Sequence, residues 1–278
     1  MASLRDLKKR LESTKATGQL AGAMRTVGTV KYSKTSSALA AFAPYAEACR
    51  HIAGSASGRR EESEDYIDRS SAPPMYVLVS GNRGLCGGVN HNLFTYFDAL
   101  YPKARDMTLV TCGRMAAEHC REKGIVAAKE IALSDIPTFD EARELALYLL
   151  SEYSSGAASE VIFVYQRFLN MLKQEPDTRR FLPAGDAEEG EGTETIFLPD
   201  EATVREELIP LCLASDVYSL LVSSAAGAHA ATVMAMRSAY DNANKTAQRL
   251  ETQIHRRRQA EVTQSVLETS GDTEEMRF

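Results

Sequence analysis

The sequence predicts an α/β protein with long helices, in which a coiled coil of the N- and C-terminal helices carries an inserted Rossmann-like α/β domain. Two observations predict the coiled coil. Residues 211–268 contain no proline and only one glycine, and a second long helical pattern occupies the first 56 residues. A third observation predicts the domain, because short apolar runs alternate with helical patterns between these ends. We therefore divide the chain into residues 1–56, 75–200 and 201–278.

The C-terminal helical stretch is too long to fold alone. At about 1.5 Å of rise per residue it would extend for roughly 85 Å, beyond the diameter of a domain of this size. Its apolar positions recur every three or four residues, which is close to the coiled-coil period. The predicted seam consists mostly of small residues: Leu220, Ser224, Ala228, Ala231, Ala235, Ala239, Ala243, Thr246, Leu250 and Ile254. Small side chains allow a second helix to approach closely.

The N-terminal stretch supplies that second helix. One stripe comprises Leu4, Leu7, Leu11, Thr14, Gly18 and Ala21, and a neighbouring stripe comprises Leu20, Met24, Val27 and Val30. Each helical glycine costs about 1 kcal/mol relative to alanine, so this helix needs its partner to hold its shape. We expect Pro44 to kink or end it.

The middle of the chain has the pattern of a parallel sheet covered by helices. A polar linker over residues 54–74 precedes predicted strands at 75–80, 107–112, 125–131 and 161–168. Predicted helices lie between them at 90–101, 114–123 and 138–153. The acidic segment 186–194 is predicted to be a solvated loop.

Composition limits the classes of function. The chain has 278 residues, of which 44% are hydrophobic and 25% charged, as in ordinary soluble proteins. Its five cysteines are scattered without a CxxC pair, and its histidines form no local cluster, so we expect reduced, mostly buried thiols and no metal site. No apolar run comes close to the roughly 20 residues that span a bilayer, so direct membrane insertion is not expected.

The net charge of −6 is unevenly distributed. Residues 1–36 carry a charge of +6 and residues 237–258 carry +4, which leaves −16 for the remainder. The basic helices favour either an acidic partner surface or simple solvation of long helices. Nucleic acid is not expected as a partner, because the chain contains no recognised binding module.

One glycine-rich turn has the position of a phosphate-binding loop. Residues 80–90 read SGNRGLCGGVN and lie between a predicted strand and a predicted helix, where backbone N–H groups can hold a phosphate. The turn lacks the Walker A ending and the GxGxxG spacing. Two interpretations stay open, a structural tight turn and the nucleotide site of an α/β enzyme. The residues that define the turn are Gly81, Arg83, Gly84, Gly87 and Gly88. No catalytic pattern such as GxSxG or HExxH occurs, and we expect neither catalytic residues nor a cofactor.

The same turn resembles the signature of the gamma subunit of F-type ATP synthase, Ser/Thr-Asp-Arg-Gly-Leu-Cys-Gly-Gly-Phe-Asn, with Asn82 for aspartate and Val89 for phenylalanine. The resemblance extends to both ends of the chain. Residues 23–25 and 44–46 resemble the family's Ala-Met and Pro-Tyr-Ala segments, and residues 256–263 (RRRQAEVT) resemble its Arg-Ala-Arg-Gln-Ala-Ala-Ile-Thr stretch. Departures at Gly22, at Ser265 and in the acidic tail suggest a divergent member, such as one from an alternative sodium- or proton-linked operon.

This resemblance implies a non-catalytic rotor. An antiparallel coiled coil would project into a ring of three alpha and three beta subunits, and the α/β domain would rest on the membrane c-ring beside an epsilon subunit. The complex would lie at the cytoplasmic face of the inner (plasma) membrane, as a peripheral part of a hydrogen-ion-transporting or sodium-transporting rotary motor. The resemblance implies partner contacts at Met24, Arg25, Arg258, Gln259 and Thr263. The rival interpretations are a nucleotide-binding α/β enzyme that uses the Gly81–Gly88 loop and a coiled-coil scaffold unrelated to rotation.

Overall fold

The structure, a computed structural model, describes residues 3–57, 72–100, 107–183 and 201–275, with side chains for 3–49, 72–100, 107–183 and 208–267. The acidic segment 186–194 and most of the predicted linker lie outside these residues. The elements in chain order are α1 (Leu4–Ser57), β1 (Met75–Val79), α2 (Val89–Leu100), β2 (Thr108–Cys112), α3 (Arg114–Glu122), β3 (Lys129–Ile131), α4 (Phe139–Ser154), β4 (Val161–Phe168), β5 (Gln174–Leu182) and α5 (Glu201–Glu275).

Contacts divide the chain into two compact units. The sheet unit comprises residues 28–232, and the helix-pair unit comprises the residues up to 27 and from 233 onward. Both long helices contribute to each unit, because the boundaries between the units fall inside α1 and α5 and not at the ends of these helices. The division of the chain into residues 1–56, 75–200 and 201–278 stays a prediction.

The sheet unit is built on a five-stranded sheet with the order β3-β2-β1-β4-β5. The four predicted strands are all present, and they pair in parallel, with Val77 opposite both Val110 and Phe163. Sequence reasoning missed β5, which pairs antiparallel with β4. This edge strand reads QEPDTRRFL, and its charges and proline hide the apolar alternation that usually identifies a strand.

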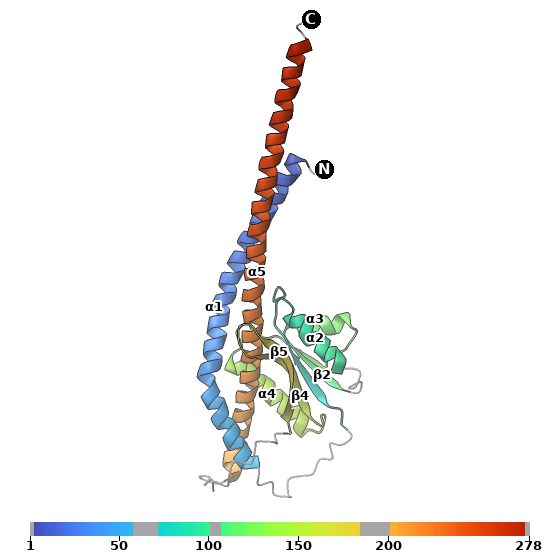
Figure 1. Ribbon diagram of the computed structural model, residues 1–278. Helices are drawn as coiled ribbons and strands as arrows, with labels where there is room; N and C mark the ends of the chain where they lie inside the picture. The colour runs from blue at the N-terminus through green and yellow to red at the C-terminus, as the bar shows by residue number, and fades with distance from the viewer. Residues whose placement is uncertain (1–2, 58–71, 101–106, 184–200, 276–278) are drawn as a thin grey trace. The chain divides into compact units, whose positions relative to one another are not determined.

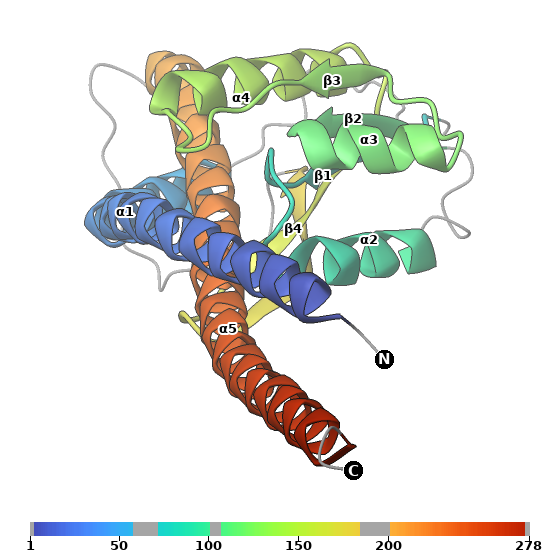
Figure 2. The same cartoon turned by 90° about the horizontal axis from the view of Figure 1, so that it is seen from above.

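Helices cover both faces of this sheet. On one face, α4 and α5 pack on β1, β2 and β4 through Leu145, Leu149, Val217 and Leu221. On the other face, α2 and α3 pack through Leu93, Phe97, Ala116 and Cys120. Figure 2 shows α4 and α2 on opposite sides of β1. All five cysteines are buried and free of disulfide bonds, as expected from their spacing.

Both terminal helices continue through a proline. Pro44 lies inside α1, so the proline does not end this helix, and Pro210 lies inside α5. In α1 the whole glycine-containing stripe, from Leu4 to Ala21, lies in the helix-pair unit, and the helix belongs to the sheet unit from Gly28 onward. The α5 helix has 75 residues and begins at Glu201, where the third predicted segment begins.

The α5 helix contains a longer apolar stretch than the sequence analysis recognised. By length and composition alone, a window within Leu208–Leu267 is apolar enough to cross a membrane, so the expectation that no such run exists was wrong. Half of this window is buried inside the protein, and Val217, Leu220 and Leu221 belong to the core described above. Packing against the sheet therefore accounts for the apolar composition.

The helix-pair unit is an antiparallel pair, as the resemblance implies (Figure 1). Residue numbers rise along α1 as they fall along α5: Lys15 pairs with Glu251 at 2.7 Å, and a Cβ on Gly18 would lie 3.2 Å from that of Ala243. The buried residues are Leu7, Gly18 and Ala21 on α1 and Val233, Met236, Ala247 and Leu250 on α5. The predicted seam is wrong at Thr246, which is exposed, because the contact shifts to Ala247.

The second predicted stripe of α1 is not buried. Leu20 is 62% exposed and Val27 is 54% exposed in the helix-pair unit, and Val30 is 52% exposed in the sheet unit. A two-helix contact covers only one narrow face of each helix, so the neighbouring apolar stripe is left at the surface.

Candidate functional site

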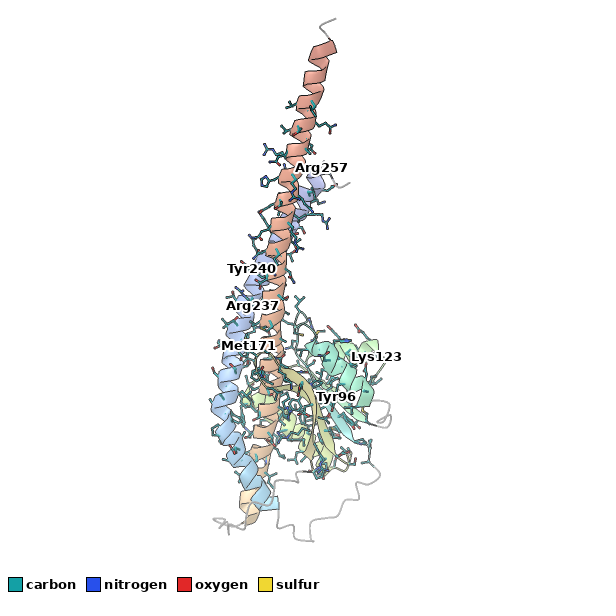
Figure 3. All side chains as sticks on the ribbon, in the orientation of Figure 1. Tyr96, Lys123, Met171, Arg237, Tyr240 and Arg257 are labelled. Atoms are coloured by element: carbon teal, nitrogen blue, oxygen red, sulfur yellow. The ribbon has the colours of Figure 1, made fainter. Side chains whose placement is uncertain are left out.

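The predicted contact residues of the helix pair fall into two separate groups. Arg25 lies against α5, with its guanidinium carbon 5.3 Å from the ring centroid of Tyr240, and Met24 is partly buried. Figure 3 marks Tyr240 and Arg257 on α5. Arg258 lies 18 residues beyond Tyr240, which corresponds to about 27 Å along a helix. The structure therefore does not bring Met24 and Arg25 together with the second group.

The second group lies on the exposed surface of α5. Arg258, Gln259 and Thr263 are all exposed, and the Thr263 hydroxyl donates to the Gln259 carbonyl at 2.9 Å. Their neighbour Arg257 pairs with Glu261 at 3.8 Å on the same helix. Arg258 and Gln259 thus project from the helix, where a partner could reach them.

The glycine-rich turn is shaped by two residues with positive φ. Leu85 has φ 61° and Gly87 has φ 63°, so the backbone is left-handed at both positions. A Cβ on Gly84 would meet no atom within 4 Å, and Cβ atoms on Gly81 or Gly88 would make only ordinary contacts. The strictest glycine was not predicted. Gly113 has φ 93°, and a Cβ there would lie 2.2 Å from the Ser80 carbonyl oxygen.

The turn caps the start of α3. The backbone N–H of Arg114 donates to Asn82 Oδ1 at 3.1 Å, that of Met115 to the Gly81 carbonyl at 3.2 Å, and that of Ala116 to Ser80 Oγ at 2.7 Å. The first N–H groups of a helix are the donors that hold a bound phosphate. At α3 these donors are already used by the turn itself.

Side chains from three distant segments meet at one carboxylate beside the turn. Asp135, in the loop before α4, accepts a short hydrogen bond from Lys31 Nζ on α1. Arg83 of the turn lies 3.4 Å away through its Nε, and Asn82 Nδ2 lies 3.4 Å from the other carboxylate oxygen. On the α5 side, His229 Nε2 is 2.6 Å from the backbone carbonyl of Asp135. We call Lys31, Asn82, Arg83, Asp135 and His229 the Asp135 cluster.

The charges in this cluster fix its protonation. The hydrogen bond from Lys31 is the main cause of a lowered pKa at Asp135, so this carboxylate is ionised at neutral pH. Burial is the main cause of a lowered pKa at His229, which is therefore neutral. A neutral imidazole facing a carbonyl oxygen must carry its proton on that nitrogen, so Nε2 donates this hydrogen bond.

Comparison with known proteins decides the family. The family model described as ATP synthase matches residues 3–273. The ATP synthase gamma chain of Pelotomaculum thermopropionicum is 33% identical over 279 residues, covering 98% of each chain. The chain belongs to the ATP synthase gamma-chain family. The resemblance predicted from the glycine-rich signature and the helix ends is thereby confirmed.

Solved structures share the gamma-chain fold at low identity. A chain in the OSCP, F1 and c-ring structure of the Euglena gracilis mitochondrial ATP synthase has a TM-score of 0.69 and 18% identity, with 98% of this chain and 94% of that chain covered. A chain of the Euglena gracilis rotor has a TM-score of 0.64 and 16% identity, with 93% and 98% covered. A chain of the central stalk and c-ring of the Tetrahymena thermophila enzyme has a TM-score of 0.58 and 19% identity, with 79% and 99% covered.

Sequence reasoning about this gamma-chain family member missed most of the Asp135 cluster. The sequence separates Lys31 from Asp135 by 104 residues and His229 from Asp135 by 94, so no local pattern links them.

Proposed function

We propose that the chain is the central-stalk rotor of an F-type ATP synthase, a non-catalytic subunit that couples transmembrane ion flow to ATP synthesis or hydrolysis. The active sites would belong to surrounding alpha and beta subunits. The observation that carries this proposal is the antiparallel helix pair, which occurs in a chain similar to a gamma chain over nearly its whole length. The apolar side chains of Leu20 and Val27 are exposed in the helix-pair unit, which favours an external partner that covers them.

The partners follow from the solved relatives. Those relatives are chains of assemblies whose titles name F1, OSCP, a central stalk and a c-ring. By analogy, this chain binds three alpha and three beta subunits through its helix pair, and an epsilon subunit and the c-ring through its sheet unit. The assembly is peripheral, at the cytoplasmic face of the inner (plasma) membrane.

Residues on both groups of the helix pair are proposed to contact the ring. Arg258, Gln259 and Thr263 are exposed, and the surplus of positive charge on residues 237–258 favours an acidic partner surface. The guanidinium of Arg25 lies over the ring of Tyr240, and Met24 is partly buried. These two residues are therefore proposed to contact the ring of subunits mainly through the shape of the helix-pair surface, and less through charge. An asymmetric rotor of this kind would favour a different conformation of each beta subunit in turn, which is a shift in populations rather than bond chemistry.

Co-purification tests the assembly. The tagged chain is expressed in its own host, and the proteins that remain bound after gentle extraction of the membrane fraction are identified. We expect ATP synthase alpha and beta subunits in a fixed ratio to the tagged chain. Recovery of the chain without them would contradict the rotor and favour an unrelated coiled-coil scaffold.

A charge reversal tests the contact at the end of α5. Arg258→Glu is expected to lower ion-coupled ATPase activity of the assembled complex, because a carboxylate would then face an acidic partner surface. Arg114→Glu is the control, since Arg114 is an exposed arginine of the sheet unit and lies outside the basic segment of α5. Equal activity of both variants and the unaltered complex would remove Arg258 from the contact.

The rival is a nucleotide-dependent enzyme that uses the glycine-rich turn. The donors at the start of α3 are occupied by Ser80, Gly81 and Asn82, so a phosphate held by the turn would have to use the N–H groups at the start of α2, which the turn precedes. The purified chain alone is titrated with ATP and assayed for hydrolysis. Tight binding or turnover by the isolated chain would favour the enzyme.

A further inference from the structure

The Asp135 cluster joins three parts of the sheet unit that are far apart in sequence. Lys31 belongs to α1, His229 belongs to α5, and Arg83 belongs to the glycine-rich turn between β1 and α2. All of them converge on Asp135, which precedes α4. Each of the two long helices therefore has its own polar tie to a single residue of the α/β domain.

Apolar contacts and directional polar contacts constrain these two helices in different ways. α5 packs on the sheet through Val217, Leu220 and Leu221, and α1 packs through Phe42, whose ring lies 6.0 Å from that of Phe139. Hydrophobic burial is non-directional, and the apolar contacts resist rotation of a helix only through the shapes of the side chains that interdigitate. Hydrogen bonds are directional and weaken steeply when the angle changes.

Partial burial strengthens the ion pair between Lys31 and Asp135. The side chains of Lys31 and Asp135 are only 23% and 24% exposed, so water screens their interaction less than it would on an open surface. Arg83 is 71% exposed and adds little by itself. The neutral imidazole of His229 adds a directional hydrogen bond to the backbone of the same residue.

The loop that carries Asp135 is itself held in place. The carboxylate of Glu141 accepts hydrogen bonds from the N–H of Ser134 and the N–H of Thr138, both at 2.8 Å, and Thr138 caps α4. Asn82 Nδ2 donates to the Leu133 carbonyl at 2.5 Å on the other side of the aspartate. Asp135 thus projects from a braced loop, which is what an anchor point requires.

We propose that the Asp135 cluster is the torque lock of this rotor: it fixes the angular setting of α1 and α5 on the α/β domain, so that rotation of the domain turns both helices without slip. The inference rests on the proposed rotor function and adds to it a positioning role for Lys31, Asp135 and His229. None of these residues contacts a substrate, and their effect passes through the two helices.

The test uses the complete membrane complex in inverted vesicles. ATP hydrolysis and ATP-driven ion uptake are measured on the same vesicles, and the readout is the ratio of ions transported to ATP hydrolysed. Asp135→Asn keeps the side-chain size and removes the charge. We expect this ratio to fall by about twofold or more, with hydrolysis largely retained, because the helices would then follow the domain less strictly.

A second variant and a control make the test specific. Lys31→Met should lower the ratio similarly, and the double variant should lower it no further than the worse single variant, because both remove the same tie. Glu130→Gln is the matched control. It breaks an ion pair with Arg121 that lies at 2.9 Å within the α/β domain and touches neither long helix, so the ratio should not change.

Each outcome decides. An unchanged ratio in Asp135→Asn and Lys31→Met complexes would overturn the torque lock. So would loss of the chain from the purified complexes, because the cluster would then serve assembly rather than coupling. Failure of the rotor proposal looks different: the unaltered complex would then show no ATP-driven ion uptake that depends on this chain.

Discussion

The helix-pair unit and the sheet unit hold the same two helices by different means. In the helix-pair unit, Gly18 and Ala243 bring the backbones close, and each helix keeps much of its surface exposed. In the sheet unit, α5 is packed into the main core, and the Asp135 cluster adds polar ties. The difference shows that a long helix can change from a structural element of a core to a thin shaft within one continuous stretch of chain.

The largest expected effect on stability is that of replacing Gly113 in the sheet unit. Gly113→Ala places a Cβ 2.2 Å from the Ser80 carbonyl at a positive φ, so we expect a loss of about 3–4 kcal/mol in the free energy of unfolding. Gly84→Ala is the control, because a Cβ there meets nothing within 4 Å. Urea unfolding of the purified chains measures both. Similar losses in the two variants would mean that the close approach at Gly113 is not a constraint.

Truncation of one leucine in each unit tests the contrast directly. Leu221 is 1% exposed in the sheet core, and Leu221→Ala should cost about 3 kcal/mol. Leu250 is 8% exposed in the helix pair, where two helices enclose less of it, and Leu250→Ala should cost less. Thermal unfolding followed by circular dichroism gives the two shifts in Tm. An equal or larger shift for Leu250→Ala would show that the helix pair is packed as tightly as the core.

A smaller effect of opposite sign is expected in the helix pair. A Cβ on Gly22 would lie 3.4 Å from the ring of Tyr240, which is an ordinary contact. Gly22→Ala should therefore gain up to about 1 kcal/mol from helix propensity. Helix content and Tm of the purified variant measure the gain. A fall in Tm would indicate that the pair depends on closer approach than the contact distance suggests.

The smallest expected effect is a dependence on pH. The pKa of His229 is lowered in the fold, mainly by burial, so the unfolded chain binds a proton more readily. This histidine therefore contributes stability that is present above about pH 6.5, the ordinary value, and is lost as the pH falls toward the lowered pKa. His229→Gln should flatten the fall in Tm across this range, whereas the exposed His91→Gln should not. Parallel pH profiles for all three proteins would remove His229 as the cause.

The parallel strands, the intervening helices and the two long helices could be predicted from the sequence, because each has a strong local pattern. β4 was predicted with its observed bounds, since it opens on a run of apolar and aromatic residues, Val161–Tyr165. β5 could not be, because an edge strand tolerates charges and Pro176 on its open side. The exposure of Leu20 was missed for a related reason: periodicity identifies an apolar stripe but does not say whether anything covers it.

The candidate site was only partly predictable. Arg258, Gln259 and Thr263 were expected to be accessible on α5, and they are exposed, but their contacts remain a prediction. The glycine-rich turn was located by its motif, whereas its role as a cap for α3 depends on Arg114 and Ala116, which follow another strand. Only the folded chain places Lys31 and His229 on the same aspartate.

The position of the Asp135 anchor has a consequence for how the protein is made. Its bracing by Glu141 uses residues within seven positions of one another, so this loop can form as soon as it leaves the ribosome. The N-terminal helix emerges first, yet its partner from Glu201 to Glu275 is synthesised last. A nascent chain must therefore carry α1 with its pairing face uncovered through most of its translation, which leaves this apolar face open to aggregation until α5 has been made.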